Sequence, residues 1–198
     1  YLKDGQWIPD PTRANHRIAH GWHKLLVDQK TSYLTGSPIV IETENEDFSE
    51  SLNEYMGDEF SDILNELVKG ACNKGVEYLH PFIDEDGEFD YIIVPAEQFI
   101  PIYEGQKQKK LQIGIRYYPV SLNGEETIKA EWWDNNQVTY YIKVNGHYIL
   151  DPWEEENPAG HFYYNDQGYG WGKVPFIPFR NNEEEVSDLT FYKDLIDD

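Results

Sequence analysis

The fold of this chain is decided by residues 111–150, which read LQIGIRYYPVSLNGEETIKAEWWDNNQVTYYIKVNGHYIL. Apolar and polar residues alternate along this stretch, and a period of two is typical of half-buried β-strands. Asn123-Gly124 and Asn145-Gly146 interrupt the alternation, and Asn-Gly is the strongest short signal for a hairpin turn. Asp134-Asn135-Asn136 forms a further break. The stretch therefore predicts antiparallel strands at Leu111–Val120, Thr127–Asp134, Gln137–Val144 and His147–Leu150.

The same period extends upstream to Val76. It predicts three more strands, at Glu77–Ile83, Phe89–Pro95 and Gln98–Ile102, with Asp86-Gly87 as the turn between the first two. Residues 151–182 are rich in proline, glycine and aromatic residues and show no clear period. We therefore expect one β-rich region over 76–182, an antiparallel meander of about five to seven strands.

The first third of the chain predicts helices. Asp10-Pro11 suits a helix start, because Pro is favoured at the first helical position, and Gly36 suits its end. Within this helix Trp22, Leu25, Leu26 and Tyr33 recur at helical spacing. We expect Trp22, Leu25 and Leu26 to pack into a core shared with a second helix.

That second helix is predicted as one continuous element from about Asp47 to Asn73, with Gly75 as its C-cap. At the other end of the chain, Val186, Leu189 and Tyr192 recur at helical spacing and predict a helix that starts near residue 183. The fold class is therefore α+β: a helical part at 1–75, a β-rich part at 76–182 and the start of a helix at 183–198. Because Tyr1 is not an initiator Met, we expect the chain to be part of a longer protein.

Composition excludes several classes of protein. The net charge is −21, from 37 acidic and 16 basic side chains, whereas proteins that grip nucleic acid present a basic patch. The single cysteine, Cys72, cannot form an internal disulfide or a cysteine-based zinc site. No apolar run approaches the roughly 18 residues that a membrane-spanning helix needs.

Two motifs suggest metal binding, and each has a plainer interpretation. The acidic run Asp84–Asp90 departs from the EF-hand spacing and is better interpreted as a hairpin turn. His16, His20 and His23 share one face of the predicted helix but lack the glutamate of an HExxH site, so surface or partly buried histidines are the better interpretation. No metal, cofactor or catalytic residue is predicted.

Two alternative functions stay open. The aromatic residues between 132 and 171, including Trp133 and Trp153, could stack on sugars in a carbohydrate-binding module, although packing in a sheet core is the simpler account. Paired carboxylates could serve a hydrolase, and that hypothesis requires two facing carboxyl groups, one with a raised pKa.

Two stretches carry a family resemblance. Residues 15–38, NHRIAHGWHKLLVDQKTSYLTGSP, resemble the early helix of portal proteins from siphophages of Gram-positive bacteria. Residues 172–183, GKVPFIPFRNNE, resemble the segment that leads into the stem of those proteins. The two stretches bracket most of the chain in the family's order, with a β-rich region between them.

The resemblance implies a structural subunit of the virion and not an enzyme. Members of that family form rings of about twelve copies at one capsid vertex, and double-stranded DNA passes through the ring during packaging and ejection. The rings are assembled in the host cytoplasm. Terminase, scaffold, capsid and connector proteins are the implied partners. This chain would form the wing region and end as a stem helix starts. The candidate core or assembly residues are Trp22, Leu25, Leu26, Tyr33, Pro175, Phe176, Pro178 and Phe179.

Overall fold

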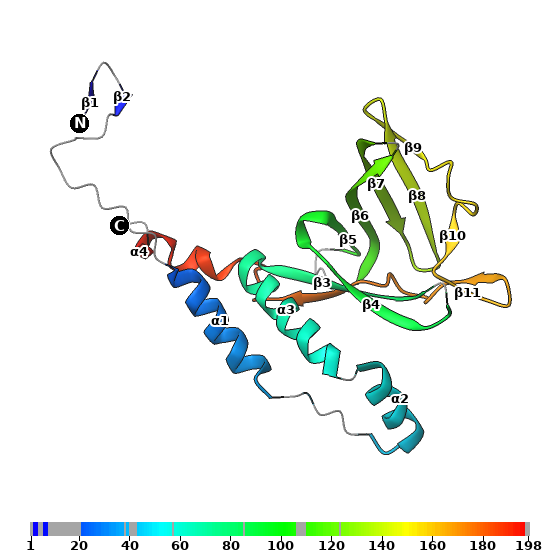
Figure 1. The fold of residues 1–198 in the computed structure, drawn as a ribbon, viewed down its shortest axis with the longest axis horizontal. Helices are drawn as coiled ribbons and strands as arrows, with labels where there is room; N and C mark the ends of the chain where they lie inside the picture. The colour runs from blue at the N-terminus through cyan, green and yellow to red at the C-terminus, as the bar shows by residue number, and fades with distance from the viewer. Residues whose placement is uncertain are drawn as a thin grey trace.

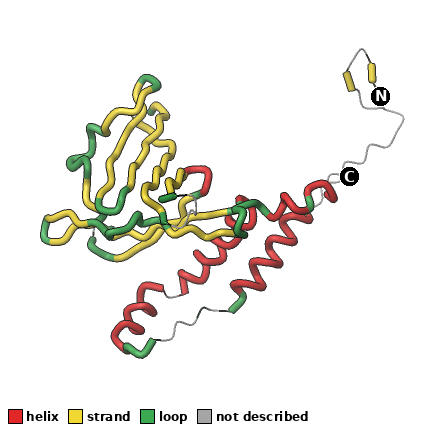
Figure 2. The backbone as a smooth tube through the Cα atoms, turned by 180° about the vertical axis from the view of Figure 1, so that it is seen from behind, coloured by secondary structure: helices red, strands yellow, loops and turns green. Residues whose placement is uncertain are grey.

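The computed structural model describes residues 2–3, 6–7, 21–37, 39, 43–56, 58–84, 86–105, 110–122 and 124–196. The chain is α+β, as predicted, with the change from helix to strand between Lys74 and Val76. The helices lie on one side of the molecule and the sheets formed by residues 76–180 on the other (Figure 2). No helix among the described residues is both long and apolar enough to cross a membrane.

The helical side contains α1 (Trp22–Thr35), α2 (Glu46–Met56) and α3 (Asp58–Lys74). The prediction of one continuous helix over 47–73 was therefore wrong. Asn45 caps the first of the two helices, because its side-chain oxygen accepts the Phe48 N–H at 3.2 Å. The predicted helix start at Asp10-Pro11 and the histidines His16 and His20 lie outside the described residues.

The β-rich side forms two main sheets, which corrects the expectation of a single meander. The larger has the order β10-β8-β7-β6-β5, with β9 also paired to β8, and the smaller has the order β13-β3-β4. The strands of the larger sheet are β5 (Phe99–Tyr103), β6 (Leu111–Leu122), β7 (Glu125–Trp133), β8 (Gln137–Val144), β9 (His147–Leu150) and β10 (Ala159–Gly160). The strands of the smaller sheet are β3 (Val76–Ile83), β4 (Phe89–Val94) and β13 (Ile177–Arg180).

The predicted hairpins are confirmed where their turn residues are described. β8 and β9 pair antiparallel through Val144 and His147, and Asn145 and Gly146 between them have φ of 51° and 83°. Positive φ at both central residues is what a tight type I′ turn requires. At the β7–β8 turn the Asp134 carboxylate accepts the N–H groups of Asn136 and Gln137, at 2.7 and 3.0 Å.

Four short strands between 159 and 180 were not predicted. Two of them, β11 (Phe162–Tyr164) and β12 (Gln167–Tyr169), form a small hairpin of their own. A further pair, β1 (Leu2–Lys3) and β2 (Gln6–Trp7), lies near the N-terminus. A 3-10 turn, η1 (Ala96–Gln98), leads from the smaller sheet into the larger one. The four strands between 159 and 180 are short, and no turn signal as strong as Asn-Gly marks them in the sequence.

The main core is built from residues of both sheets, whose arrangement Figure 1 shows. It joins β3 and β4 of the smaller sheet to β5, β7, β8 and β10 of the larger one. Its buried members are Val76, Tyr78, Val94, Phe99, Trp133, Val138, Ala159, Val174 and Phe176. The helices α1 and α3 pack against each other, and α3 also covers β3 and β13.

The helix predicted from residue 183 does not form there. Residues 188–191 make a 3-10 turn, η2 (Asp188–Phe191), and the first α-helical residues after it are α4 (Lys193–Ile196). Side chains compete with a helix at this point, because Asn182 Oδ1 accepts the Val186 N–H at 2.9 Å while Glu185 has a φ of 55°. A left-handed residue cannot continue an α-helix.

Candidate functional site

The outward face of α1 carries large apolar side chains. Trp22 is 53% exposed, Leu25 55%, Leu26 43% and Tyr33 88%. The prediction that Trp22, Leu25 and Leu26 fill a core shared with the second helix was therefore wrong. A run of exposed apolar residues on one helix face is typical of a surface that contacts another molecule.

The inward face of α1 is small and partly polar. Val27 and Thr31 are its buried residues, 2% and 1% exposed, and they pack towards α3. Polar contacts flank them: Asn65 donates to Thr35 Oγ1 at 2.8 Å, and Lys69 pairs with Asp28 at 3.1 Å. Lys24 and Lys69 together hold the pKa of Asp28 below its ordinary value. Thus α1 is attached to α3 by few apolar atoms and several polar ones.

The second of the two resembling stretches lies at the junction of the sheets. Phe176 is 4% exposed, and its ring contacts His80 and Phe99, each with centroids 4.4 Å apart. Pro175 is also buried, whereas Pro178 and Phe179 are half-buried in β13. β13 is an edge strand, where a proline removes no ladder hydrogen bond. Phe176 therefore joins the smaller sheet to the larger one, since His80 lies on β3 and Phe99 on β5.

His80 is a buried and uncharged part of this junction. It is 4% exposed, and its Nδ1 lies 2.7 Å from the Pro175 carbonyl oxygen, to which it donates. Its ring also meets Trp133 edge-on, with centroids 4.8 Å apart. Burial lowers the pKa of His80 to about 4, so the ring is neutral at pH 7. A neutral imidazole can pack among aromatic rings without leaving a charge unpaired.

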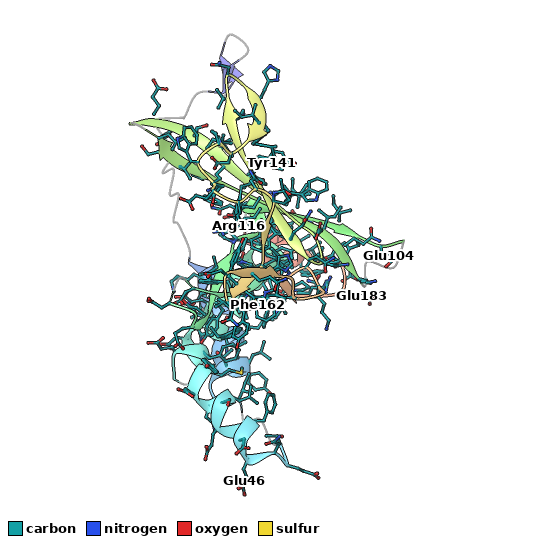
Figure 3. All side chains as sticks on the ribbon, turned by 90° about the vertical axis from the view of Figure 1, so that its right-hand side faces the viewer. Glu46, Glu104, Arg116, Tyr141, Phe162 and Glu183 are labelled. Carbon is teal, nitrogen blue, oxygen red and sulfur yellow. The ribbon has the colours of Figure 1, made fainter. Side chains whose placement is uncertain are left out.

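A buried carboxylate closes the same junction. Glu131 is 4% exposed and accepts hydrogen bonds from Tyr118 Oη at 2.7 Å and Trp133 Nε1 at 3.0 Å. Arg116 approaches it at 3.6 Å and lies over the Tyr118 ring. Figure 3 places Arg116 in the middle of the molecule and Glu46 at the far end of the helical side. Because its charge is paired, Glu131 is suited to fixing the sheet geometry.

The acidic run at 84–90 is a hairpin turn, as interpreted from the sequence. Asp84 accepts the N–H groups of Asp86 and Glu88 at 2.9 and 2.8 Å, and Phe89 then opens β4. The described residues contain no group of three or more His, Cys, Asp or Glu placed to hold a metal. His23, the described member of the histidine series, bonds Tyr192 at 2.6 Å and Asn73 at 2.8 Å.

The hydrolase alternative finds no support among the described carboxyl groups. Three carboxyl groups among the described residues have shifted pKa values: Asp28, Glu97 and Asp188. Each pKa is lowered, whereas the general acid of a hydrolase needs a raised pKa. The aromatic side chains of 132–171 divide between core and surface. Trp133 is buried, but Trp153 and Tyr164 are 61% and 66% exposed. The expectation that they pack chiefly in a sheet core was therefore wrong.

Sequence reasoning missed a polar cluster where the chain turns back onto α1. Lys30 donates to Asn181 Oδ1 at 2.7 Å and to the Asp188 carboxylate at 2.9 and 3.0 Å. Asn181 in turn donates to Asp188 at 2.8 Å. The signal present in the sequence was Asn181-Asn182, since asparagine side chains often bond nearby backbone and end helices.

Comparison with known proteins identifies the family of the chain. Residues 6–198 match the family described as phage portal protein, SPP1 Gp6-like. The chain is 50% identical over 199 aligned residues to the portal protein of Bacillus phage SPP1, covering 100% of this chain and 40% of that protein. It is 31% identical over 196 residues to the portal protein of Clostridium phage phiCD119, covering 93% of this chain and 42% of that protein. The chain thus spans about two fifths of the length of these relatives, and it belongs to the SPP1 Gp6-like family of phage portal proteins.

Proposed function

We propose that this chain forms the wing region of a portal subunit, which assembles into a ring at one vertex of a phage capsid. The observation that carries the proposal is the family match over residues 6–198. The helical part at 1–75, the β-rich part at 76–182 and the segment from 183 would then be parts of the wing and the approach to the stem. The role is structural, and ATP hydrolysis would belong to the terminase that docks on the ring.

The charge of the chain supports the proposal for a conduit. Duplex DNA slides easily only past a wall that does not hold its phosphates, and about ten phosphate contacts would give strong, salt-dependent binding. With 37 acidic and 16 basic side chains, this region offers little such binding. Terminase, scaffold, capsid and connector proteins are the proposed partners, and the virion is the proposed location.

Electron microscopy of the full-length protein tests the proposal. Rings of about twelve or thirteen subunits are expected. A full-length protein that stays strictly monomeric over the concentration range of the experiment would overturn it. Glycan binding lost on Trp153→Ala would favour the carbohydrate alternative instead, because that indole is exposed.

The outward face of α1 is our candidate for a contact between neighbouring subunits. Its side chains are exposed in the single chain, and a ring covers such surfaces by repeating one contact between copies. Leu25→Asp in the full-length protein should lower the fraction of subunits found in rings. Ile149→Asp is the matched control, because Ile149 is also exposed, at 45%, but lies on β9. Equal ring formation by wild type and Leu25→Asp would show that the outward face of α1 is not part of the interface between subunits.

A further inference from the structure

A segment at the end of the chain holds α1 in place. Residues 181–192, here called the latch, run from the end of β13 past the C-terminal end of α3 to the start of α4. The latch contacts α1 at two points through side chains that are more than 150 residues apart in sequence. One point is the Lys30 cluster with Asn181 and Asp188, and the other is the His23–Tyr192 pair.

The latch is fixed to α3 as well as to α1. Asn181 N–H donates to the Gly75 carbonyl at 2.9 Å, and Ser187 Oγ donates to the Cys72 carbonyl at 3.2 Å. Gly75 has a φ of 98°, and a Cβ built there would lie 1.9 Å from the Glu185 carbonyl oxygen. The latch therefore lies directly on the backbone at the end of α3, in a space that only glycine leaves open.

The Lys30 contact is the strongest of the latch contacts. Burial is the largest single influence on Lys30 and lowers its pKa, but the hydrogen bond and charge of Asp188, together with Cys72, more than offset burial, and the net pKa is raised. The Lys30 and Asp188 side chains are 38% and 19% exposed, so water screens this pair less than a free surface pair. Hydrogen bonds between charged groups at such sites contribute more than neutral ones.

Cys72 lies beneath this cluster. The thiol is 1% exposed, and its residue precedes Asn73, which bonds His23. Burial raises the pKa of the thiol, and the charges of Lys30 and Asp188 both act on it. The sulfur is therefore a natural reporter of whether the latch covers the junction of α1 and α3.

We propose that residues 181–192 act as a releasable latch, which couples the position of the chain beyond Tyr192 to the attachment of α1. While the latch is closed, α1 is held by Lys30 and His23 on its inner side. When the segment that follows Tyr192 is displaced, these contacts break together, because they belong to one short stretch of chain. α1 then keeps its packing on α3 and the contacts made by Asn65 and Lys69, and Cys72 becomes accessible. Movement at the C-terminal end of this region is thereby transmitted to the exposed face of α1.

The test is the rate at which N-ethylmaleimide labels Cys72 in the full-length protein, followed by peptide-resolved mass spectrometry. Lys30→Met should raise that rate about tenfold, the factor expected for losing a charge-assisted hydrogen bond. Removing the lysine charge raises the pKa of the thiol further and would by itself slow labelling, so a faster rate reports opening. Lys24→Met is the matched control, since Lys24 lies on the same helix, is 78% exposed and pairs within α1.

A second variant and a second measurement separate latch opening from unfolding. Tyr192→Phe removes only the hydroxyl that meets His23, so a smaller rise in the labelling rate is expected. Amide hydrogen exchange should then quicken in α1 and stay slow in β7 and β8. Equal labelling of wild type and Lys30→Met would overturn the proposal. Faster exchange spread evenly over α1, β7 and β8 would also overturn it, because the variant would then act through global unfolding.

Discussion

The junction between the two sheets and the junction between α1 and the rest of the molecule are held by different forces. At the first, Phe176 is 4% exposed and sits among aromatic rings. At the second, Leu25 is 55% exposed and points away, while Lys30 and Asp188 make the contact. Apolar burial stabilises the sheet junction in the single chain. The α1 junction is weaker alone, which suits an element that binds a neighbour or moves.

The largest effect of a substitution is expected at the sheet junction, where Phe176 is the central ring. Phe176→Ala should reduce the free energy of unfolding by about 3–5 kcal/mol, because the cavity cannot collapse between two sheets. Urea denaturation followed by tryptophan fluorescence measures this. Phe191→Ala is the control, since that ring is 67% exposed and its loss should cost less than about 0.5 kcal/mol.

The same junction should weaken in acid. The pKa of His80 is 6.5 when unfolded and about 4 when folded, so the unfolded chain binds more protons between those values. Stability should therefore fall as pH drops from 6.5 towards 4, by up to about 1.4 kcal/mol per pH unit from this group. Denaturation at several pH values should show a shallower slope for His80→Phe. The exposed His147→Phe should keep the wild-type slope; an unchanged slope in both variants would contradict the assignment.

Gly75 lies where the latch covers the end of α3. Gly75→Ala should cost about 2–3 kcal/mol, since the residue has a φ of 98° and faces the Glu185 carbonyl oxygen. Gly124→Ala is a matched control, because its φ is 86° but nothing lies within 4 Å of a Cβ there. Thermal denaturation of both variants isolates the effect of the contact. Equal losses of stability in the two variants would show that the contact with the latch adds no cost at Gly75.

The exposed side chains of α1 should contribute less to stability than its buried ones. Trp22→Ala should cost about 1 kcal/mol, because 53% of the side chain is already exposed. Val27→Ala removes far fewer atoms but should cost more, about 2 kcal/mol, because Val27 is 2% exposed. Chemical denaturation of the two variants tests this order. A larger loss of stability for Trp22→Ala than for Val27→Ala would show that the indole is packed in a core.

The sequence predicts local structure well where turn residues demand one geometry. Asn145-Gly146 fixed the β8–β9 hairpin, and Gly75, after the last residue of α3, marked the change from helix to strand. The pairing of β13 with β3 joins residues about a hundred positions apart, and no local pattern reveals it.

The candidate site was predicted only in part, for a physical reason. Periodicity identifies an apolar stripe, but it does not say whether the stripe faces a core or another molecule. Phe176 lies in a core and Leu25 on a surface, although both belong to stretches with the same family resemblance. The latch escaped prediction because its contacts are polar and depend on Lys30 meeting Asp188 across the folded chain.

The tight turn at Asn145-Gly146 has a practical consequence for imaging. It lies at the tip of the β8–β9 hairpin, and nothing occupies the space within 4 Å of a Cβ at Gly146. Exposed loop tips accept inserted sequence with little effect on the fold. A small rigid tag placed after Gly146 would therefore give each subunit a visible marker, and the radius and angle of the markers would orient this sheet in an assembled particle.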